Sequence, residues 1–178
     1  SAIDRATILT DVLNMPWREA ATSVIPPGIS GYQNGQVGHT FDVTQAQDYL
    51  SQAGYPGGAG LPEIELWANF GNETTVDAVA SQWETYLGIT VTTFYTEWTP
   101  YLDTLFGCAG DPGACDYNAY RLGWIMDYAD ARNLLNDLLH PDSNSQFTGW
   151  DNVRYRQLII SATMVLIPCS AARSSWRS

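Results

Sequence analysis

The stretch from Glu63 to Phe94, EIELWANFGNETTVDAVASQWETYLGITVTTF, decides the fold of this chain. Residues Glu63–Ala68 alternate between polar and apolar side chains, which predicts a strand with one buried face. Between Thr74 and Leu87 apolar residues recur with helical spacing, which predicts an amphipathic helix closed by Gly88. A second predicted strand, Ile89–Phe94, follows directly. This order of elements predicts a βαβ unit with parallel strands and a right-handed crossover.

The segments before this unit predict two helices joined by a long irregular stretch. Apolar residues within Ile3–Leu13 have helical spacing and predict the first helix. A second helix is expected over Val43–Ala53, with Asp42 as its N-cap and Gly54 in the position of a C-terminal cap. The stretch Trp17–Thr40 is rich in proline and glycine. We interpret it as a rigid wrap over the surface rather than a moving lid, because proline restricts the backbone and glycine permits tight turns.

The segments after the βαβ unit predict one more strand and three more helices. The strand is expected at Asp116–Trp124, and the helices at Trp98–Phe106, Ala131–Leu139 and Asn152–Thr163. Together the elements predict a single α/β lobe over residues 1–163, with a mixed, mostly parallel sheet flanked by helices. Residues 164–178 break this pattern, because helical periodicity stops and a Ser- and Arg-rich run follows. We expect this tail to be a shifted reading frame, a truncation or an unusual, disordered end.

The composition excludes several classes of partner. The chain has 178 residues, with 8 Lys+Arg against 19 Asp+Glu and a net charge of −11 at pH 7. All the basic residues are Arg, and they form no basic stripe, so nucleic acid and anionic membrane surfaces are not expected to bind. Because only 15% of the residues are charged and 45% are hydrophobic, we expect a packed core. No apolar run is long enough to span a membrane, and the N-terminus has no signal-peptide pattern, so we expect any export signal or anchor to lie outside this sequence.

Two cysteines bracket a short loop. Cys108 and Cys115 enclose a Gly-, Pro- and Asp-rich segment, GCAGDPGACD, and this spacing predicts a disulfide, with two free thiols on a flexible turn as the alternative. A disulfide implies an oxidising compartment. His39 and His140 are the only histidines and lie far from this loop in sequence, so neither a metal site nor a cofactor is expected.

Short motifs along the chain match the landmarks of a known family. In chain order they are Ala2-Ile3-Asp4-Arg5 with Ile8, Ile25-Pro26-Pro27-Gly28, Gly31-Tyr32, Phe41-Asp42 with Ala46 and Leu50, Ala53-Gly54-Tyr55-Pro56, Leu61-Pro62, Gln82-Trp83, Leu87-Gly88-Ile89, Trp98, Tyr101-Leu102, Gly123-Trp124, Asp127-Tyr128, Trp150-Asp151-Asn152, Tyr155, Leu158-Ile159 and Ala162. Each motif alone is weak. The ordered series resembles one lobe of the solute-binding proteins of ABC importers, in the oligopeptide- and dipeptide-binding cluster known as extracellular solute-binding protein family 5.

The resemblance implies a fold and a function. Such receptors have the periplasmic-binding-protein fold, in which two lobes enclose a ligand cleft, close by hinge motion and deliver the solute to an ABC permease. The chain resembles the isolated second lobe, and thus half of a binding site, in the periplasm or outside the cell, with a membrane-anchored lipoprotein as one form. The implied ligand is an oligopeptide or dipeptide. An oligosaccharide is the alternative, because some relatives bind one and the seven Trp suit sugar stacking. A non-catalytic extracellular interaction module is a further alternative.

The segment GWIMDY, residues 123–128, holds the first candidate ligand-binding residues. In the peptide-binding branch, the acid at the position of Asp127 pairs with the α-amino group of the ligand. Asp127 also follows the predicted third strand, and α/β sheets bind ligands at the carboxyl ends of their strands. The alternative is that Asp127 caps the next helix, although Asp130 is the better capping candidate. Trp124 is expected to flank the cleft or to pack in the core.

Two further residues are weaker candidates. Trp67 ends the first strand, close to the edge where a cleft would open. Arg121 is expected to bind a ligand carboxylate or to form a surface ion pair, on the opposite strand face from Trp124. An enzyme would pair Asp127 with another acid, as in sugar hydrolysis. Two carboxylates are unspecific evidence in a chain with 19 acidic residues, and the common hydrolase and nucleotide-binding motifs are absent from the sequence, so we do not expect catalysis.

Overall fold

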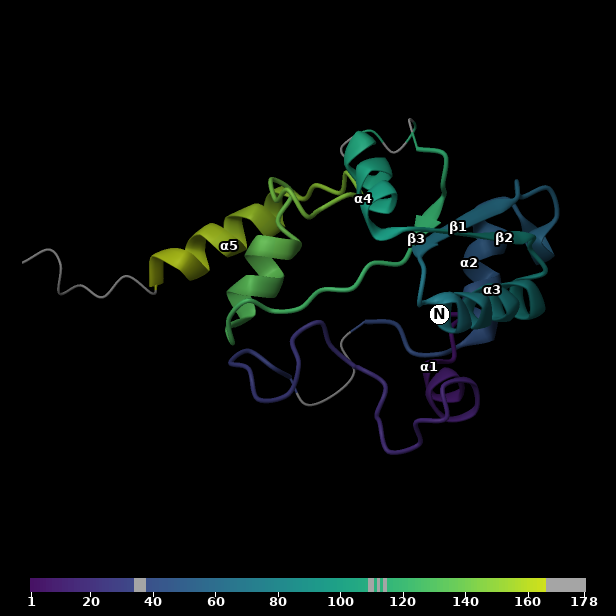
Figure 1. Ribbon diagram of the computed structural model, residues 1–178, viewed down its shortest axis with the longest axis horizontal. Coiled ribbons are helices and arrows are strands. Elements are labelled where there is room, and N and C mark those ends of the chain that lie inside the picture. Colours follow the sequence, from purple (N-terminus) through teal and green to yellow (C-terminus); the bar gives the residue numbers. More distant parts are fainter. Residues whose placement is uncertain (34–37, 109–110, 112, 114, 166–178) are drawn as a thin grey trace, which may run out of the picture.

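The computed structural model describes residues 1–33, 38–108, 111, 113 and 115–165. Its elements in chain order are α1 (Arg5–Thr7), η1 (Ile8–Val12), α2 (Val43–Gln52), η2 (Pro56–Gly58), β1 (Ile64–Asn69), α3 (Glu73–Leu87), β2 (Val91–Thr96), α4 (Trp98–Gly107), β3 (Ala119–Tyr120), η4 (Asn133–Leu138) and α5 (Val153–Val165) (Figure 1). The first two residues of the expected tail, 164–165, continue α5, and the rest of the tail lies outside the described residues.

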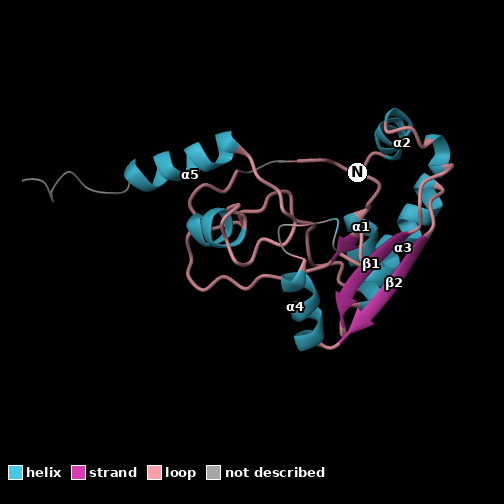
Figure 2. Cartoon of the chain, turned by 90° about the horizontal axis from the view of Figure 1, so that it is seen from above, coloured by secondary structure: helices cyan, strands magenta, loops and turns pink. Residues whose placement is uncertain are grey.

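The central sheet contains the predicted βαβ unit. Strands β1 and β2 pair in parallel, from Ile64 opposite Val91 to Asn69 opposite Thr96, and α3 connects them (Figure 2). Strand β3 pairs in parallel with the other edge of β1, so the strand order is β2-β1-β3. The prediction of a parallel α/β arrangement is therefore confirmed.

Alternation along β1 creates two separate hydrophobic clusters. Leu66 and Ala68 are buried and pack with Val76 and Ala80 of α3. The side chain between them, Trp67, instead packs against a second cluster, whose buried members are Tyr101, Leu105, Cys108, Tyr117 and Phe147. Because successive side chains of a strand point to opposite faces, α3 covers one face of the sheet and α4 the other (Figure 1).

The third strand is much shorter than predicted. We expected a strand over Asp116–Trp124, whereas β3 contains two residues. Pairing with β1 ends where the main-chain N–H of Arg121 donates to the carbonyl of Trp67. The carbonyl of Arg121 then accepts from the hydroxyl of Tyr101, on α4, at 2.7 Å. Because this side chain replaces a main-chain partner, the ladder stops and the following residues run without strand structure.

The helix ends follow the predicted capping signals. The carboxylate of Asp42 accepts from the N–H of Gln45 at 2.8 Å and caps α2. Gly88 closes α3 with a left-handed φ of 68°. The helices expected over Ile3–Leu13 and Ala131–Leu139 are present, but much of each is π-helical, in η1 and η4. The stretch Trp17–Thr40 has no regular element in its described part, as expected.

Candidate functional site

A buried amide connects the two main candidate residues. The side chain of Asn133 has an exposed fraction of 0%. Its Oδ1 atom accepts from the indole N–H of Trp124 at 2.7 Å. Its Nδ2 atom lies 3.4 Å from Oδ2 of Asp127 and 3.4 Å from Oδ2 of Asp137. Trp124 is half-buried and Asp127 is exposed, so the structure brings this pair together at an accessible surface.

The carboxylate of Asp137 belongs to the same network. The hydroxyl of Tyr128 donates to Oδ2 of Asp137, and the amide of Asn136 donates to Oδ1 at 2.8 Å. The Tyr128 hydrogen bond is the main reason why the pKa of Asp137 lies below its usual value, with the Asn136 amide as the next contribution. The same bond raises the pKa of Tyr128. Asp137 is therefore an ionised, hydrogen-bonded neighbour of the amide at neutral pH.

A hollow of about 490 Å³ opens beside Trp124. One side is formed by Trp124, Met126 and Leu134, and the opposite side by the irregular N-terminal stretch. The lining residues from that stretch are Glu19, Ala20, Ala21, Thr22, Ser23, Val24, Ile25, Pro26, Pro27 and Tyr32. The irregular stretch Trp17–Thr40 thus forms one wall of the hollow beside Trp124.

A larger hollow of about 870 Å³ lies elsewhere, against β3 and the start of α5. Its described lining is largely aromatic and aliphatic, with Tyr117, Tyr120, Phe147 and Tyr155 among the residues, and includes no charged side chain. Neither Trp124 nor Asp127 contributes to its wall. It therefore offers no ionic partner for the charged end of a ligand, and we place the candidate site at Asp127.

The position of Asp127 differs from the prediction in one respect. The strand that was expected to lead into it ends at Tyr120, so Asp127 lies in an irregular segment rather than at a carboxyl strand end. The capping role falls to Asp130, whose Oδ1 accepts from the N–H of Arg132 at 2.7 Å. The side-chain contact of Asp127 in the described structure is with Asn133.

The other two candidates lie apart from this network. The ring of Trp67 packs against Phe94, with centroids 4.1 Å apart, and its indole N–H donates to a carboxylate oxygen of Glu65 at 3.2 Å. The Arg121 side chain is exposed and folds over Gly123, where an added Cβ would lie 3.3 Å from Nη1. Among the described residues we find no carboxylate in an ion pair with Arg121, so the expected surface pair is not seen there.

Sequence reasoning missed Asn133, Tyr128 and Asp137 as members of the network. The i, i+4 spacing of Asn133 and Asp137 places both side chains on one helix face. That spacing could have indicated a contact between the two side chains, but many pairs of polar residues on exposed helix surfaces have the same spacing. The burial of an amide within the segment RNLLNDLL, residues 132–139, is set by tertiary packing.

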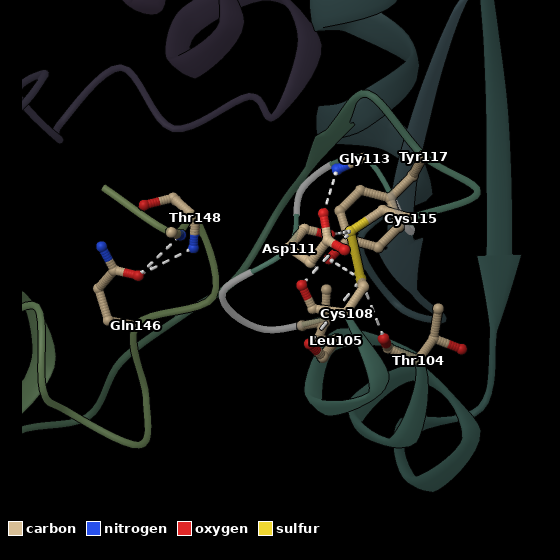
Figure 3. Close-up of a disulfide and its surroundings, with 10 residues drawn as sticks. Thr104, Leu105, Cys108, Asp111, Gly113, Cys115, Tyr117, Gln146 and Thr148 are labelled. Atoms are coloured by element: carbon tan, nitrogen blue, oxygen red, sulfur yellow. Dashed lines mark hydrogen bonds between the residues drawn. A yellow bond between two sulfur atoms is a disulfide. The ribbon is translucent and has the colours of Figure 1, made fainter. Parts of the chain in front are cut away.

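The predicted disulfide between Cys108 and Cys115 is present (Figure 3). It connects the end of α4 to the segment that enters β3, and Cys108 is buried in the aromatic cluster, with its Sγ atom 3.1 Å from the hydroxyl of Tyr117. In the part of the chain that the structure describes, no three His, Cys, Asp or Glu side chains gather as metal ligands would. Nor does any helix there combine the length and apolar character of a membrane span.

Comparison with known proteins gives consistent matches. Residues 1–146 match the family model described as bacterial extracellular solute-binding proteins, family 5 Middle. The oligopeptide-binding protein OppA of Bacillus subtilis (strain 168) is 28% identical over 169 residues, which cover 89% of this chain and 29% of OppA. The probable deoxycholate-binding periplasmic protein YgiS of Escherichia coli (strain K12) is 33% identical over 174 residues, covering 92% of this chain and 30% of YgiS.

Solved structures agree with these matches. The periplasmic oligopeptide-binding protein OppAIV of Borrelia burgdorferi has a TM-score of 0.76 and 26% identity, covering 90% of this chain and 31% of that protein. The chain thus spans less than a third of the length of these relatives. They are named for peptides or deoxycholate and none of them for an oligosaccharide, so the sugar alternative gains no support. They are binding proteins, in agreement with the expectation of no catalysis. The chain belongs to family 5 of the bacterial extracellular solute-binding proteins.

Proposed function

We propose that residues 1–163 form one lobe of a receptor that captures peptides outside the cytoplasmic membrane and delivers them to an ABC importer. In this proposal the surface at Trp124 and Asp127 is one wall of a cleft, and a second lobe supplies the other wall. The observation that carries it is the exposed Asp127 carboxylate, held beside a half-buried indole by the amide of Asn133. Relatives named as oligopeptide-binding proteins support the ligand class.

The chemistry of the site fits a free amino terminus. Asp127 is exposed in this lobe, and in the proposal the second lobe shields it from water when the cleft closes. A carboxylate in such a closed cleft forms a charge-assisted hydrogen bond with an ammonium ion, worth about 1.5–3 kcal/mol net. The face of Trp124 adds an apolar or cation-binding surface next to it. Every unmodified peptide has an α-amino group, so this contact tolerates varied side chains. The disulfide supports a location in an oxidising compartment such as the periplasm.

The test is calorimetry on the full-length protein with one peptide in two forms, with a free and with an acetylated amino terminus. We expect the free form to bind about 10- to 150-fold more tightly, which corresponds to 1.5–3 kcal/mol. Asp127→Asn should remove most of this difference. Asp130→Asn is the matched control, because Asn also caps helices and the Asp130 side chain bonds to the main chain of Arg132 rather than to a side chain of the network. Equal affinity for both peptides in the unmodified protein would refute the amine anchor.

A second candidate ligand is an amphipathic steroid acid. YgiS, named as a probable deoxycholate-binding protein, is 33% identical to this chain, and the hollow beside Trp124 has an apolar wall. Deoxycholate carries a carboxylate, which Asp127 would repel rather than attract. Binding of deoxycholate that is equal or stronger in Asp127→Asn, with no binding of peptide, would favour this candidate.

A further inference from the structure

We propose that Asn133 is a positioning residue, which orients Asp127 and Trp124 for the ligand. This inference rests on the proposed function, because it assigns a role to Asn133 through those two residues. The positioning role requires no contact between Asn133 and the ligand, because the amide of Asn133 is completely buried.

The chemistry of its three partners fixes the orientation of the amide. The indole N–H of Trp124 can only donate, so the atom 2.7 Å from it must be the amide oxygen. Ionised carboxylates can only accept, so the NH₂ group must face Asp127 and Asp137. A flipped amide would place its oxygen between two carboxylates and its hydrogens against the indole N–H. The network therefore permits one orientation of the Asn133 side chain.

The arrangement holds Asp127 without neutralising it. Tyr128 and Asn136 donate hydrogen bonds to Asp137 and fix its carboxylate, which in turn accepts from the amide of Asn133. One NH₂ group has two hydrogens and serves both carboxylates. An arginine or lysine in this place would satisfy the charge of Asp127 and compete with a ligand ammonium ion. A neutral amide leaves the charge available and restricts the rotamer, which is what a pre-organised binding group requires.

The test uses Asn133→Asp in the full-length protein with the free and acetylated peptides. This variant keeps an oxygen for Trp124 but presents a third acceptor to Asp127 and Asp137. We expect the preference for the free peptide to fall at least tenfold, while affinity for the acetylated peptide stays within twofold. Asn152→Asp is the matched control, because it adds the same charge at an exposed position outside the network, and an Asp oxygen can still accept from the N–H of Tyr155 at the start of α5. It should retain the preference.

Asn133→Ser removes the amide without adding charge and should also reduce the preference. An unchanged preference in both Asn133 variants, with the preference lost in Asp127→Asn, would overturn the positioning role and leave the proposed function intact. Equal weakening of both peptides, or failure of both variants to fold, would assign Asn133 to packing alone and overturn it as well. If the unmodified protein shows no preference, the amine anchor itself has failed and the positioning role fails with it.

Discussion

The hydroxyl of Tyr101 donates to the main-chain carbonyl of Arg121 at 2.7 Å and lies 3.3 Å from the carbonyl oxygen of Trp67. Tyr101 has an exposed fraction of 0%. Burial raises the pKa of this hydroxyl, so it remains a donor throughout the physiological range. One side chain of α4 thus satisfies the carbonyl at which β3 leaves the sheet, just before the segment that contains Trp124 and Asp127.

Tyr101→Phe should destabilise the protein by about 1–3 kcal/mol, because the partly buried carbonyl of Arg121 loses its partner while packing is retained. Urea unfolding measures the change. Tyr49→Phe is the control, since Tyr49 is exposed on α2, and its effect should stay within about 0.5 kcal/mol. Equal effects of the two substitutions would mean that the Arg121 carbonyl finds another partner.

Gly88→Ala should cost more than Gly54→Ala, although both glycines have positive φ, at 68° and 95°. An added Cβ on Gly88 would lie 2.7 Å from the carbonyl oxygen of Gly57, whereas one on Gly54 would meet no atom within 4 Å. We expect about 1 kcal/mol for Gly54→Ala from backbone strain alone, and at least about 2 kcal/mol for Gly88→Ala. Thermal unfolding of the two variants provides the comparison; similar melting temperatures would contradict the clash.

Replacing both cysteines with alanine should lower stability by about 2–3 kcal/mol, because the bridge links residues seven positions apart and restricts the unfolded chain. Reductant should lower the melting temperature of the unmodified protein and leave that of the double variant unchanged. A double variant that still responds to reductant would show that the effect does not come from this bridge.

Tyr95 should make stability depend on alkaline pH. Its hydroxyl donates to Oδ1 of Asp77 at 2.5 Å, and burial followed by this bond raises its pKa from 10.0 to about 12. The folded state therefore favours the neutral hydroxyl, so the contribution is complete below pH 10 and is lost as the pH rises to about 12. The stability difference between the protein and Tyr95→Phe, measured by urea unfolding, should shrink over that window. A constant difference would exclude this linkage.

Trp67 and Trp124 should respond differently to replacement by phenylalanine. Trp67 packs against Phe94 and Tyr117 in an aromatic cluster, so Trp67→Phe should lower stability by about 1–3 kcal/mol and leave peptide affinity nearly unchanged. Trp124→Phe should weaken peptide binding, because it removes the indole that anchors Asn133. Calorimetry and thermal unfolding of both variants separate the two roles; a large loss of affinity in Trp67→Phe would restore it as a ligand residue.

The local sequence was sufficient to predict the elements whose signals lie within a few residues. The alternation along β1, the helical spacing in α3 and the caps at Asp42 and Gly88 are of this kind, and the structure has them where they were expected. The Cys108–Cys115 bridge also joins neighbours in sequence. These features are determined by backbone preferences and short-range spacing.

The features that the sequence did not predict depend on contacts between distant segments. Strand β3 is short because Tyr101, twenty positions away, takes the carbonyl of Arg121. Trp124 and Asp127 were each expected to line one cleft, but the amide that connects them was not predicted, since a polar residue in a helix is usually exposed. Hydrophobic periodicity in the sequence indicates which face of a helix or strand is apolar, but it does not indicate which buried polar side chains will be hydrogen-bonded to each other.

The one-way hydrogen bond from Trp124 to Asn133 has an evolutionary consequence. A substitution at position 124 that removes the indole would leave the buried Oδ1 atom of Asn133 without a donor, while the two carboxylates would still hold its NH₂ group. Position 133 would then tolerate a different residue, and the present asparagine would become a liability. Across the family, positions 124 and 133 should therefore change together.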